Sequence, residues 1–278
     1  MVGALSKCCL VAMELVDEVL CEGGSGLEVS TWSDAPQGSG LGTSSILGCG
    51  ICVALARVFG RLYTDASLVH LTLHVEQLLS TGGGWQDQVG GLVGGFKYAT
   101  SANTLPLTVD IATVQAPEGF AEEFNSHLVL VYTGHQRLAK NILWEVLRNW
   151  FRRSPEVTEI IASLKSRAAE VAQCIAAGDL AGVAAGIEDY WRLKRAIAGP
   201  SAEPEFVATI RGKIAPYVLG SSLAGAGGGG FLVAITKEAN NEECLKKALG
   251  EEIEKGSVQV FPGALDMKGI TAIIESDN

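Results

Sequence analysis

The sequence has little basic charge. Its 21 Lys and Arg residues stand against 31 Asp and Glu residues, for a formal net charge of −10. No basic run is longer than Arg152–Arg153. Proteins that hold a nucleic-acid backbone neutralise its phosphates with clustered Lys and Arg. We therefore expect no nucleic-acid partner, and we expect any bound anion to be held by backbone amides and a metal ion.

Long apolar runs and targeting signals are also missing. The sequence contains no stretch of eighteen uncharged apolar residues, so no membrane partner is expected. Apolar residues recur with a helical period over the first twenty positions. Charged residues such as Lys7 and Glu14 interrupt any signal-peptide core there. The expected compartment is the cytoplasm.

The seven cysteines are an odd number with irregular spacing, which argues against a secreted disulfide framework. Cys49 and Cys52 form a C-x-x-C inside an apolar helical stretch, without a second pair that could complete a zinc site. We interpret them as small core residues; a redox pair is the alternative.

Hydrophobic periodicity and glycine clusters predict an α+β protein with two domains, at residues 1–125 and 126–278. In the first domain they predict an opening helix, a strand at 27–32, helices to about 59 and at 66–80, a glycine-rich loop at 81–95, and strands at 96–98 and 107–114. In the second they predict a strand at 127–132, helices at 138–152, 156–177, 180–197 and 203–217, a strand at 231–236, a helix at 241–254, and strands at 257–261 and 270–274.

Glycine is abundant, with 34 residues. The first cluster, PQGSGLGTSS at 36–45, directly precedes a predicted helix. Backbone N–H groups and the positive end of a helix would converge there, which suits a phosphate. The loop has no lysine, so it is not a Walker A motif, and its glycine spacing does not fit G-x-G-x-x-G. A helix start capped by Thr43 or Ser44 is the alternative.

The same stretch resembles the P-x-x-x-G-L-G-[ST]-S motif of the GHMP kinase superfamily, named for galactokinase, homoserine kinase, mevalonate kinase and phosphomevalonate kinase. The resemblance implies that the loop wraps the phosphates of ATP and that the Ser44 hydroxyl helps to hold Mg²⁺. The implied ATP-binding residues are Pro36, Gly38, Ser39, Gly40, Leu41, Gly42, Thr43, Ser44 and Ser45.

A later cluster, LAGAGGGGF at 223–231, resembles the closing glycine motif of the superfamily. Consecutive glycines before a strand are entropically costly unless a close backbone approach requires them. The resemblance implies that Gly225, Ala226, Gly227 and Gly228 pack against the phosphate loop and the substrate. It also implies a partial ribosomal-protein-S5-domain-2-like amino-terminal domain and a ferredoxin-like carboxyl-terminal domain.

Two carboxylates complete the resemblance. Glu76 is predicted on a helix and Asp87, eleven residues on, in the glycine-rich loop. By resemblance Glu76 is a Mg²⁺ ligand and Asp87 is the catalytic residue that accepts or orients the substrate hydroxyl. Mg²⁺ prefers carboxylate, hydroxyl and phosphate oxygens, and phosphoryl transfer depends on positioning and charge neutralisation. A solvated helix residue and a turn residue are the respective alternatives.

Other side chains near these motifs are less specific. Gly84, Trp85 and Gln86 are expected to contact the substrate, although Trp85 could equally be a core residue. His70 and His74 have the i, i+4 spacing of a zinc pair but no obvious third ligand. Arg137 and Lys140 could reach the site or cap a helix.

Four stretches, TGGGWQDQVGGL, GSGLGTSSILG, VYTGxxRLA and SLAGAGGGGF, resemble the fucokinases within the superfamily, over residues 27–236. This resemblance implies transfer of the ATP γ-phosphate to the anomeric hydroxyl of L-fucose, giving β-L-fucose 1-phosphate. A kinase for heptose phosphate or another sugar, and a non-catalytic nucleotide-binding module, are the alternatives.

The first superfamily motif, which carries a glycine pair and an acidic residue, has no match before Pro36. We therefore expect that the amino-terminal domain is truncated. A preceding amino-terminal segment or domain of a longer chain is an expected partner. The chain alone is expected to be inactive or weakly active.

Overall fold

The computed structural model describes residues 27–36, 38–79, 83–135 and 139–275, without the side chains of 139–141. The predicted opening helix lies outside these residues. The chain divides into two compact units. Unit 1 contains the described parts of 1–34, 42–112 and 266–278, and unit 2 contains those of 35–41 and 113–265.

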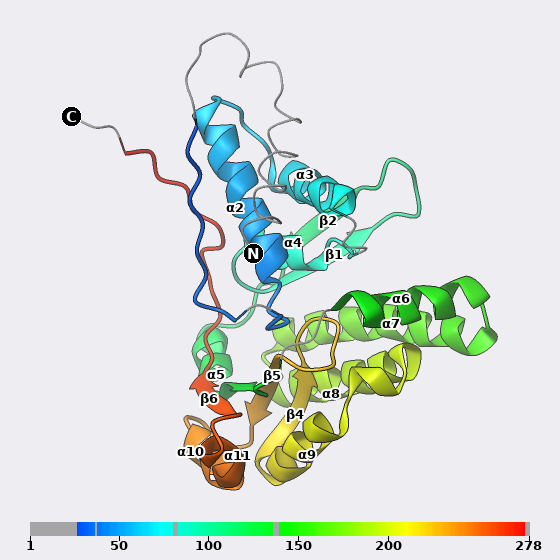
Figure 1. Ribbon diagram of the computed structural model, residues 1–278, viewed down its shortest axis with the longest axis vertical. Coiled ribbons are helices and arrows are strands. Elements are labelled where there is room, and N and C mark those ends of the chain that lie inside the picture. Colours follow the sequence, from blue (N-terminus) through cyan, green and yellow to red (C-terminus); the bar gives the residue numbers. More distant parts are fainter. Residues whose placement is uncertain (1–26, 37, 80–82, 136–138, 276–278) are drawn as a thin grey trace. The chain divides into compact units, whose positions relative to one another are not determined.

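In its described residues, unit 1 contains three helices and a two-stranded sheet (Figure 1). Its elements are α2 (Thr43–Val58), α3 (Asp65–Leu78), α4 (Gln86–Leu92), β1 (Lys97–Ser101) and β2 (Val109–Thr113). The apolar sides of the helices form one core with Val109 of β2. Cys49 and Cys52 are buried in it at 0% and 2% exposure, which confirms the core interpretation. Burial raises the pKa of the Cys49 thiol to about 11.

The prediction of an unbroken loop at 81–95 was wrong, because α4 lies within it. Two glycines, Gly90 and Gly91, lower the helix propensity of this stretch. Tertiary contacts compensate, since Val89 and Leu92 are buried in the core at 3% and 4% exposure. Asp87 therefore lies in the first turn of a helix.

Lys97 caps the carboxyl-terminal end of α4. Its ammonium donates to the carbonyl oxygen of Gly90 at 3.3 Å and to that of Val93. The carbonyl groups at a helix end carry partial negative charge, which a cation stabilises. Burial lowers the pKa of Lys97, against the raising influence of the negative charge of Asp266.

We expect Lys97→Met to lower the free energy of unfolding of unit 1 by about 1.5 kcal/mol, because it removes charge-assisted hydrogen bonds and keeps the apolar stem. Hydrogen exchange of the α4 amides together with thermal unfolding measures this change. Lys165→Met, at an exposed position of a helix in unit 2, is the matched control and should be near neutral. Equal exchange of α4 amides in wild type and Lys97→Met would contradict the role of the cap.

Residues from the end of the chain return to unit 1. The amide of Gly95 donates to the carbonyl of Asp266 at 2.7 Å, and the amide of Ile270 donates to that of Leu92 at 3.1 Å. A single antiparallel bridge joins Val93 and Gly269.

Two predicted strands were wrong. Residues 27–32 and 270–274 form no strand in the part of the chain that the structure describes. A strand needs a ladder of hydrogen bonds to a neighbouring strand, and neither segment pairs with a strand among the described residues, since the single bond of Ile270 to Leu92 does not extend into a ladder. Their apolar side chains are correspondingly exposed, as Trp32 at 82% and Ile273 at 84% show.

Unit 2 is a four-stranded antiparallel sheet with helices around it (Figure 1). The strand order is β4–β5–β3–β6, formed by Val218–Leu223, Phe231–Thr236, Leu128–Tyr132 and Gln259–Pro262. The helices are α5 (Phe120–His127), α6 (Ala139–Arg152), α7 (Pro155–Ala177), α8 (Leu180–Ala198), α9 (Glu205–Ile214), α10 (Glu242–Ala248) and α11 (Gly250–Glu254), with 3-10 turns at Pro200–Ala202 and Ala215–Tyr217. The predictions missed α5 and β4. Among the described residues, no helix is long and apolar enough to cross a membrane.

The helix α8 lies close against the edge strand β4. A Cβ atom on Gly220 would lie 2.1 Å from the carbonyl oxygen of Ala184, so this approach requires glycine. Glu188 of α8 accepts from the Ser221 amide at 3.0 Å and pairs with Arg211 of α9 at 2.5 Å. These contacts fix the strand that enters the closing glycine cluster.

A buried ionic cluster centres on Glu203, whose side chain is 8% exposed. The carboxylate accepts from the Trp191 indole at 2.9 Å and from Arg211 at 2.7 Å, and it also pairs with Arg195. Although burial raises its pKa, hydrogen bonds from Trp191 and Arg211 and the charges of both arginines hold the pKa of Glu203 below its usual value.

Candidate active site

The first half of the predicted phosphate loop belongs to unit 2. The amide of Ser39 donates to the Pro36 carbonyl at 3.1 Å, and the Leu41 amide approaches the Ser39 hydroxyl at 3.4 Å. Gly38 and Gly40 have φ angles of 71° and 79°, which side chains rarely adopt. Ser39, in the middle of this segment, is buried at 1% exposure and therefore anchors the loop to unit 2.

The closing glycine cluster packs directly against this half of the loop. The Phe231 amide donates to the Ser39 carbonyl at 2.8 Å. A Cβ atom on Gly40 would lie 2.6 Å from the Ala224 carbonyl oxygen, and one on Gly225 would lie 2.8 Å from the Gly40 Cα. The packing of these two glycine motifs within unit 2 explains why positions 40 and 225 do not accommodate a side chain.

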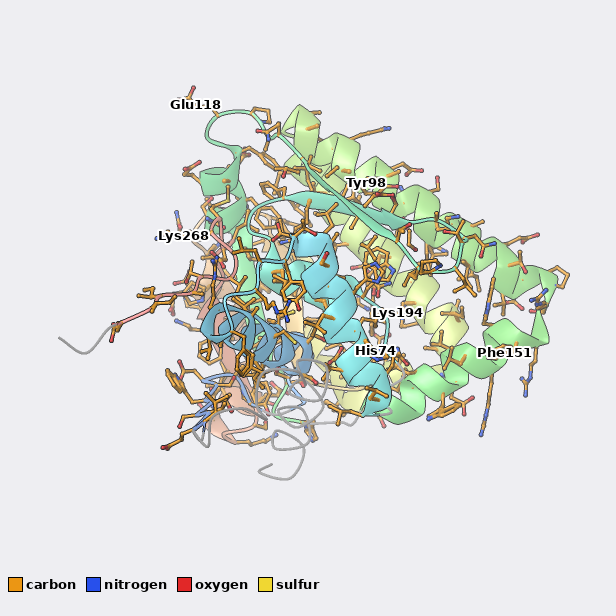
Figure 2. All side chains as sticks on the ribbon, turned by 90° about the horizontal axis from the view of Figure 1, so that it is seen from above. His74, Tyr98, Glu118, Phe151, Lys194 and Lys268 are labelled. Atoms are coloured by element: carbon orange, nitrogen blue, oxygen red, sulfur yellow. The ribbon has the colours of Figure 1, made fainter. Side chains whose placement is uncertain are left out.

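The rest of the closing cluster is held from several sides. The Gly228 amide donates to the Ala202 carbonyl at 2.7 Å, and a Cβ atom on Gly227 would lie 3.2 Å from Cη2 of the buried Trp191. Thr133 donates to the Gly230 carbonyl through both its amide and its hydroxyl, at 2.9 Å each. Lys194 of α8 (Figure 2) donates to the Gly225 carbonyl. Gly225, Ala226, Gly227 and Gly228 therefore form a preorganised backbone surface.

We expect Gly40→Ala to destabilise unit 2 by at least about 2 kcal/mol, because it adds a backbone clash to an unfavourable φ angle. Gly60→Ala is the matched control, since Gly60 has a φ of 63° with nothing within 4 Å of the added Cβ. That control isolates the backbone strain, which costs about 1 kcal/mol. Denaturant unfolding of both variants measures the difference, and equal losses would show that the contact with Ala224 is unimportant.

The second half of the loop lies in unit 1 and starts α2. The N-cap residue Gly42 has a φ of 68° and provides no side-chain cap, and the first turn of α2 contains no acidic residue. The positive end of this helix is thus suited to an anion. The alternative of a helix start capped by Thr43 or Ser44 is not what the structure shows, because the cap position is Gly42.

Ser44 and Glu76, the two predicted metal ligands, are in contact. The Ser44 hydroxyl donates to Glu76 Oε1 at 3.1 Å, and the Ser45 hydroxyl lies 3.0 and 3.1 Å from the two carboxylate oxygens. Glu76 is only 6% exposed, which excludes the interpretation of a solvated helix residue. Burial raises the pKa of Glu76, the hydroxyls of Ser45 and Ser44 lower it, and the charge of Asp87 raises it.

Asp87 lies beside the same loop. A Cβ atom on Gly42 would lie 3.1 Å from both Cβ and Cγ of Asp87, so the carboxylate side chain covers the backbone of Gly42. Asp87 is exposed, in contrast to the buried Glu76. Unit 1 thus brings together Gly42, Ser44, Ser45, Glu76 and Asp87 from three helices.

The residues just before Asp87 are less engaged. Gly84 and Gln86 are exposed, and a Cβ atom on Gly84 would meet the Gln86 amide oxygen at 2.4 Å. Trp85 packs against the core of unit 1, which favours its interpretation as a core residue. His74 is exposed on α3 (Figure 2), whereas His70 is half-buried. Arg137 and the side chain of Lys140 lie outside the described residues.

The sequence prediction missed Gln88. Its side chain is fully buried, and its Nε2 donates to Glu76 Oε2. The contact joins α3 to α4 across twelve positions. A helical period would have predicted that position 88 faces away from Asp87, but nothing in the sequence indicates that it faces Glu76.

The donor set of unit 1 fits Mg²⁺. A serine hydroxyl and a carboxylate are hard oxygen ligands, and Mg²⁺ is commonly held by one or two such groups together with phosphate oxygens. Ser44 and Glu76 would hold the ion, and the amides at the start of α2 would face the phosphates. When bound, the ion neutralises phosphate charge.

Comparison with known proteins defines the class of this chain. Residues 6–95 match the family model of the GHMP kinases N terminal domain. A solved D-glycero-D-manno-heptose 1-phosphate kinase from Bacteroides thetaiotaomicron superposes with a TM-score of 0.70 at 19% identity, covering 95% of this chain and 73% of that one. The chain therefore has the GHMP kinase fold, with a GHMP kinase N-terminal domain.

Among individual proteins, the chain is similar to two bifunctional enzymes that contain a fucokinase. It is 32% identical over 90% of its length to the fucokinase/GDP-fucose pyrophosphorylase of Arabidopsis thaliana. It is 30% identical over 93% of its length to the L-fucokinase/L-fucose-1-P guanylyltransferase of Bacteroides fragilis. The chain spans about a quarter of each relative, 24% and 27% respectively.

Proposed function

We propose that this chain is the kinase portion of an ATP-dependent sugar kinase, acting with ATP and Mg²⁺ on the anomeric hydroxyl of L-fucose to give β-L-fucose 1-phosphate. The observation that carries the proposal is the contact of Ser44 with Glu76 at the start of α2, with Asp87 beside Gly42. The similarity to fucokinase-containing enzymes over most of the chain supports the choice of sugar.

The start of α2 and the side chains of Ser44, Glu76 and Asp87 each have a role in this proposal. The uncapped start of α2 binds phosphate oxygens through backbone amides. Ser44 and Glu76 hold the metal ion. Asp87 orients the sugar hydroxyl and accepts its proton as the hydroxyl oxygen bonds to the γ-phosphorus and ADP leaves. The exposure of Asp87 allows a sugar to reach it, while the burial of Glu76 keeps that carboxylate in place.

The glycine motifs of unit 2 contribute rigidity. Because Gly225–Gly228 are held by Lys194, Ala202 and Trp191, their backbone is ordered before any ligand binds. Preorganised amides cost no reorganisation when charge develops, which makes them effective in phosphoryl transfer. We propose that they bind substrate and support the loop around Ser39 and Gly40.

The test is ADP release with Mg²⁺ and ATP over L-fucose, D-galactose, D-mannose and a heptose 7-phosphate. We expect release above the sugar-free background with L-fucose, even if turnover by this chain alone is weak. A heptose phosphate as the best substrate would replace L-fucose by the alternative of a heptose-phosphate kinase, which similarity to a heptose 7-phosphate kinase at 28% identity supports. If nucleotide binds without release for any sugar, the same assay on a chain extended at its amino terminus decides: release there would assign the silence to truncation, and silence there would favour a non-catalytic nucleotide-binding module.

A further inference from the structure

Gln88 is buried in an unusual way for a glutamine. Asp87 and Gln88 are neighbours on α4, yet Asp87 is exposed and Gln88 has 0% exposure. Successive helix residues point about 100° apart, so one faces the loop and the other faces α3. Burying an amide without full hydrogen bonding costs about 1–3 kcal/mol.

Hydrogen bonding offsets only part of the cost of burying the Gln88 amide. The Nε2 group of Gln88 donates to Glu76 Oε2. Its Oε1 atom is buried and has no hydrogen-bond partner among the residues that the structure describes. A leucine or methionine would fill a similar volume in this core without leaving a desolvated acceptor. The amide therefore contributes little as packing, and its function must be sought in what it donates to.

The group that accepts this hydrogen bond from Gln88 is the carboxylate of Glu76, the predicted metal ligand. Oε1 of Glu76 accepts from Ser44 and Ser45, and Oε2 accepts from Ser45 and Gln88. The serines belong to α2 and Gln88 to α4, so the carboxylate is held from two sides and cannot rotate without losing a donor. Ser44, Ser45 and Gln88 are neutral side chains. They orient the carboxylate without cancelling the negative charge that attracts a cation.

We propose that Gln88 is a positioning residue for Glu76: its amide fixes the plane of the carboxylate, presents Oε1 beside Ser44, and couples this ligand to the helix that carries Asp87. The proposal rests on the proposed function, in which Ser44 and Glu76 hold the metal ion. Groups that orient a metal ligand typically change metal affinity or activity about 10–100-fold when they are removed.

The test compares metal binding with sugar binding. In Gln88→Leu we expect the binding of Mn²⁺ with ADP, followed by electron paramagnetic resonance, to weaken about 10–100-fold. In the ADP-release assay we expect the Mg²⁺ concentration for half-maximal rate to rise by a similar factor, while KM for the sugar changes little. A merely structural role would not separate these two quantities.

Two further variants keep the outcome interpretable. Gln88→Met retains an unbranched side chain without the amide, and it should behave like Gln88→Leu if the donor matters. Gln173→Leu, at an exposed position on α7, is the matched control and should bind Mn²⁺ and ADP as the wild type does. Thermal unfolding identifies which variants are folded.

The outcomes are distinct. Wild-type binding of Mn²⁺ and ADP in the folded Gln88 variants would overturn the positioning role and leave the proposed function intact. Failure of the wild type itself to bind the metal with nucleotide would overturn both. Weaker metal binding together with an equal loss of sugar affinity would show general damage to unit 1, and would also overturn the proposal.

Discussion

Asp87→Asn is expected to lower kcat for phosphoryl transfer about 10²–10⁴-fold, the usual contribution of a positioned carboxylate base. Asparagine keeps the size of the side chain over Gly42 and removes its capacity to accept a proton. Because Asp87 is exposed, the midpoint of thermal unfolding should not fall. Steady-state ADP release and a titration with ADP measure the two effects separately.

Asp110→Asn is the matched control for this experiment. Asp110 is an exposed residue of β2 in the same unit, and its substitution should leave kcat unchanged. A normal rate in Asp87→Asn would remove the catalytic role of that residue. A low rate accompanied by weak ADP binding would instead assign Asp87 to nucleotide binding.

The second large effect concerns stability. Glu203→Gln is expected to lower the free energy of unfolding of unit 2 by about 3–5 kcal/mol, the usual loss when one partner of a buried ion pair is removed. The substitution removes one of the two carboxylates that pair with Arg211, whose side chain is 12% exposed, and leaves only Glu188. The indole of Trp191 donates to Glu203 and lies next to Gly227, so disorder of the closing cluster should accompany the loss.

The pH dependence of this loss has a definite sign. Because the folded-state pKa of Glu203 is lowered, its ionic contribution is complete above the unfolded glutamate value of about 4.3. That contribution disappears as the pH falls through the lower folded-state pKa. The difference between wild type and Glu203→Gln should therefore shrink in acid. Glu159→Gln, on the exposed side of α7, should cost less than about 0.5 kcal/mol at any pH.

Much of the secondary structure was predictable because local pattern and tertiary environment agree. The long helices of unit 2 have regular apolar periods and were predicted within a few residues of their observed bounds. The contact of Ser44 with Glu76 could not be derived from spacing alone, and it was expected only through the resemblance of the loop to a kinase motif. The roles of Ser44, Glu76 and Asp87 stay predictions.

The predictions that failed concern residues whose structure depends on partners distant in sequence. The helix α4 contains two glycines and forms because its apolar residues reach the core and Lys97 caps its end. Residues 27–32 have the alternation of a strand but no described strand to pair with. The side-chain direction of Gln88 follows from the packing of α3 against α4, which no local pattern encodes.

The discontinuity of the two units has a consequence for biosynthesis. Unit 2 uses residues 35–41, and unit 1 is completed by residues from position 266 onward that bond to Leu92 and Gly95. As a ribosome releases the chain in order, unit 1 cannot acquire its last backbone partners until almost all of unit 2 has emerged. Cutting the gene between residues 112 and 113 would likewise divide both units, so neither half is a natural fragment for expression.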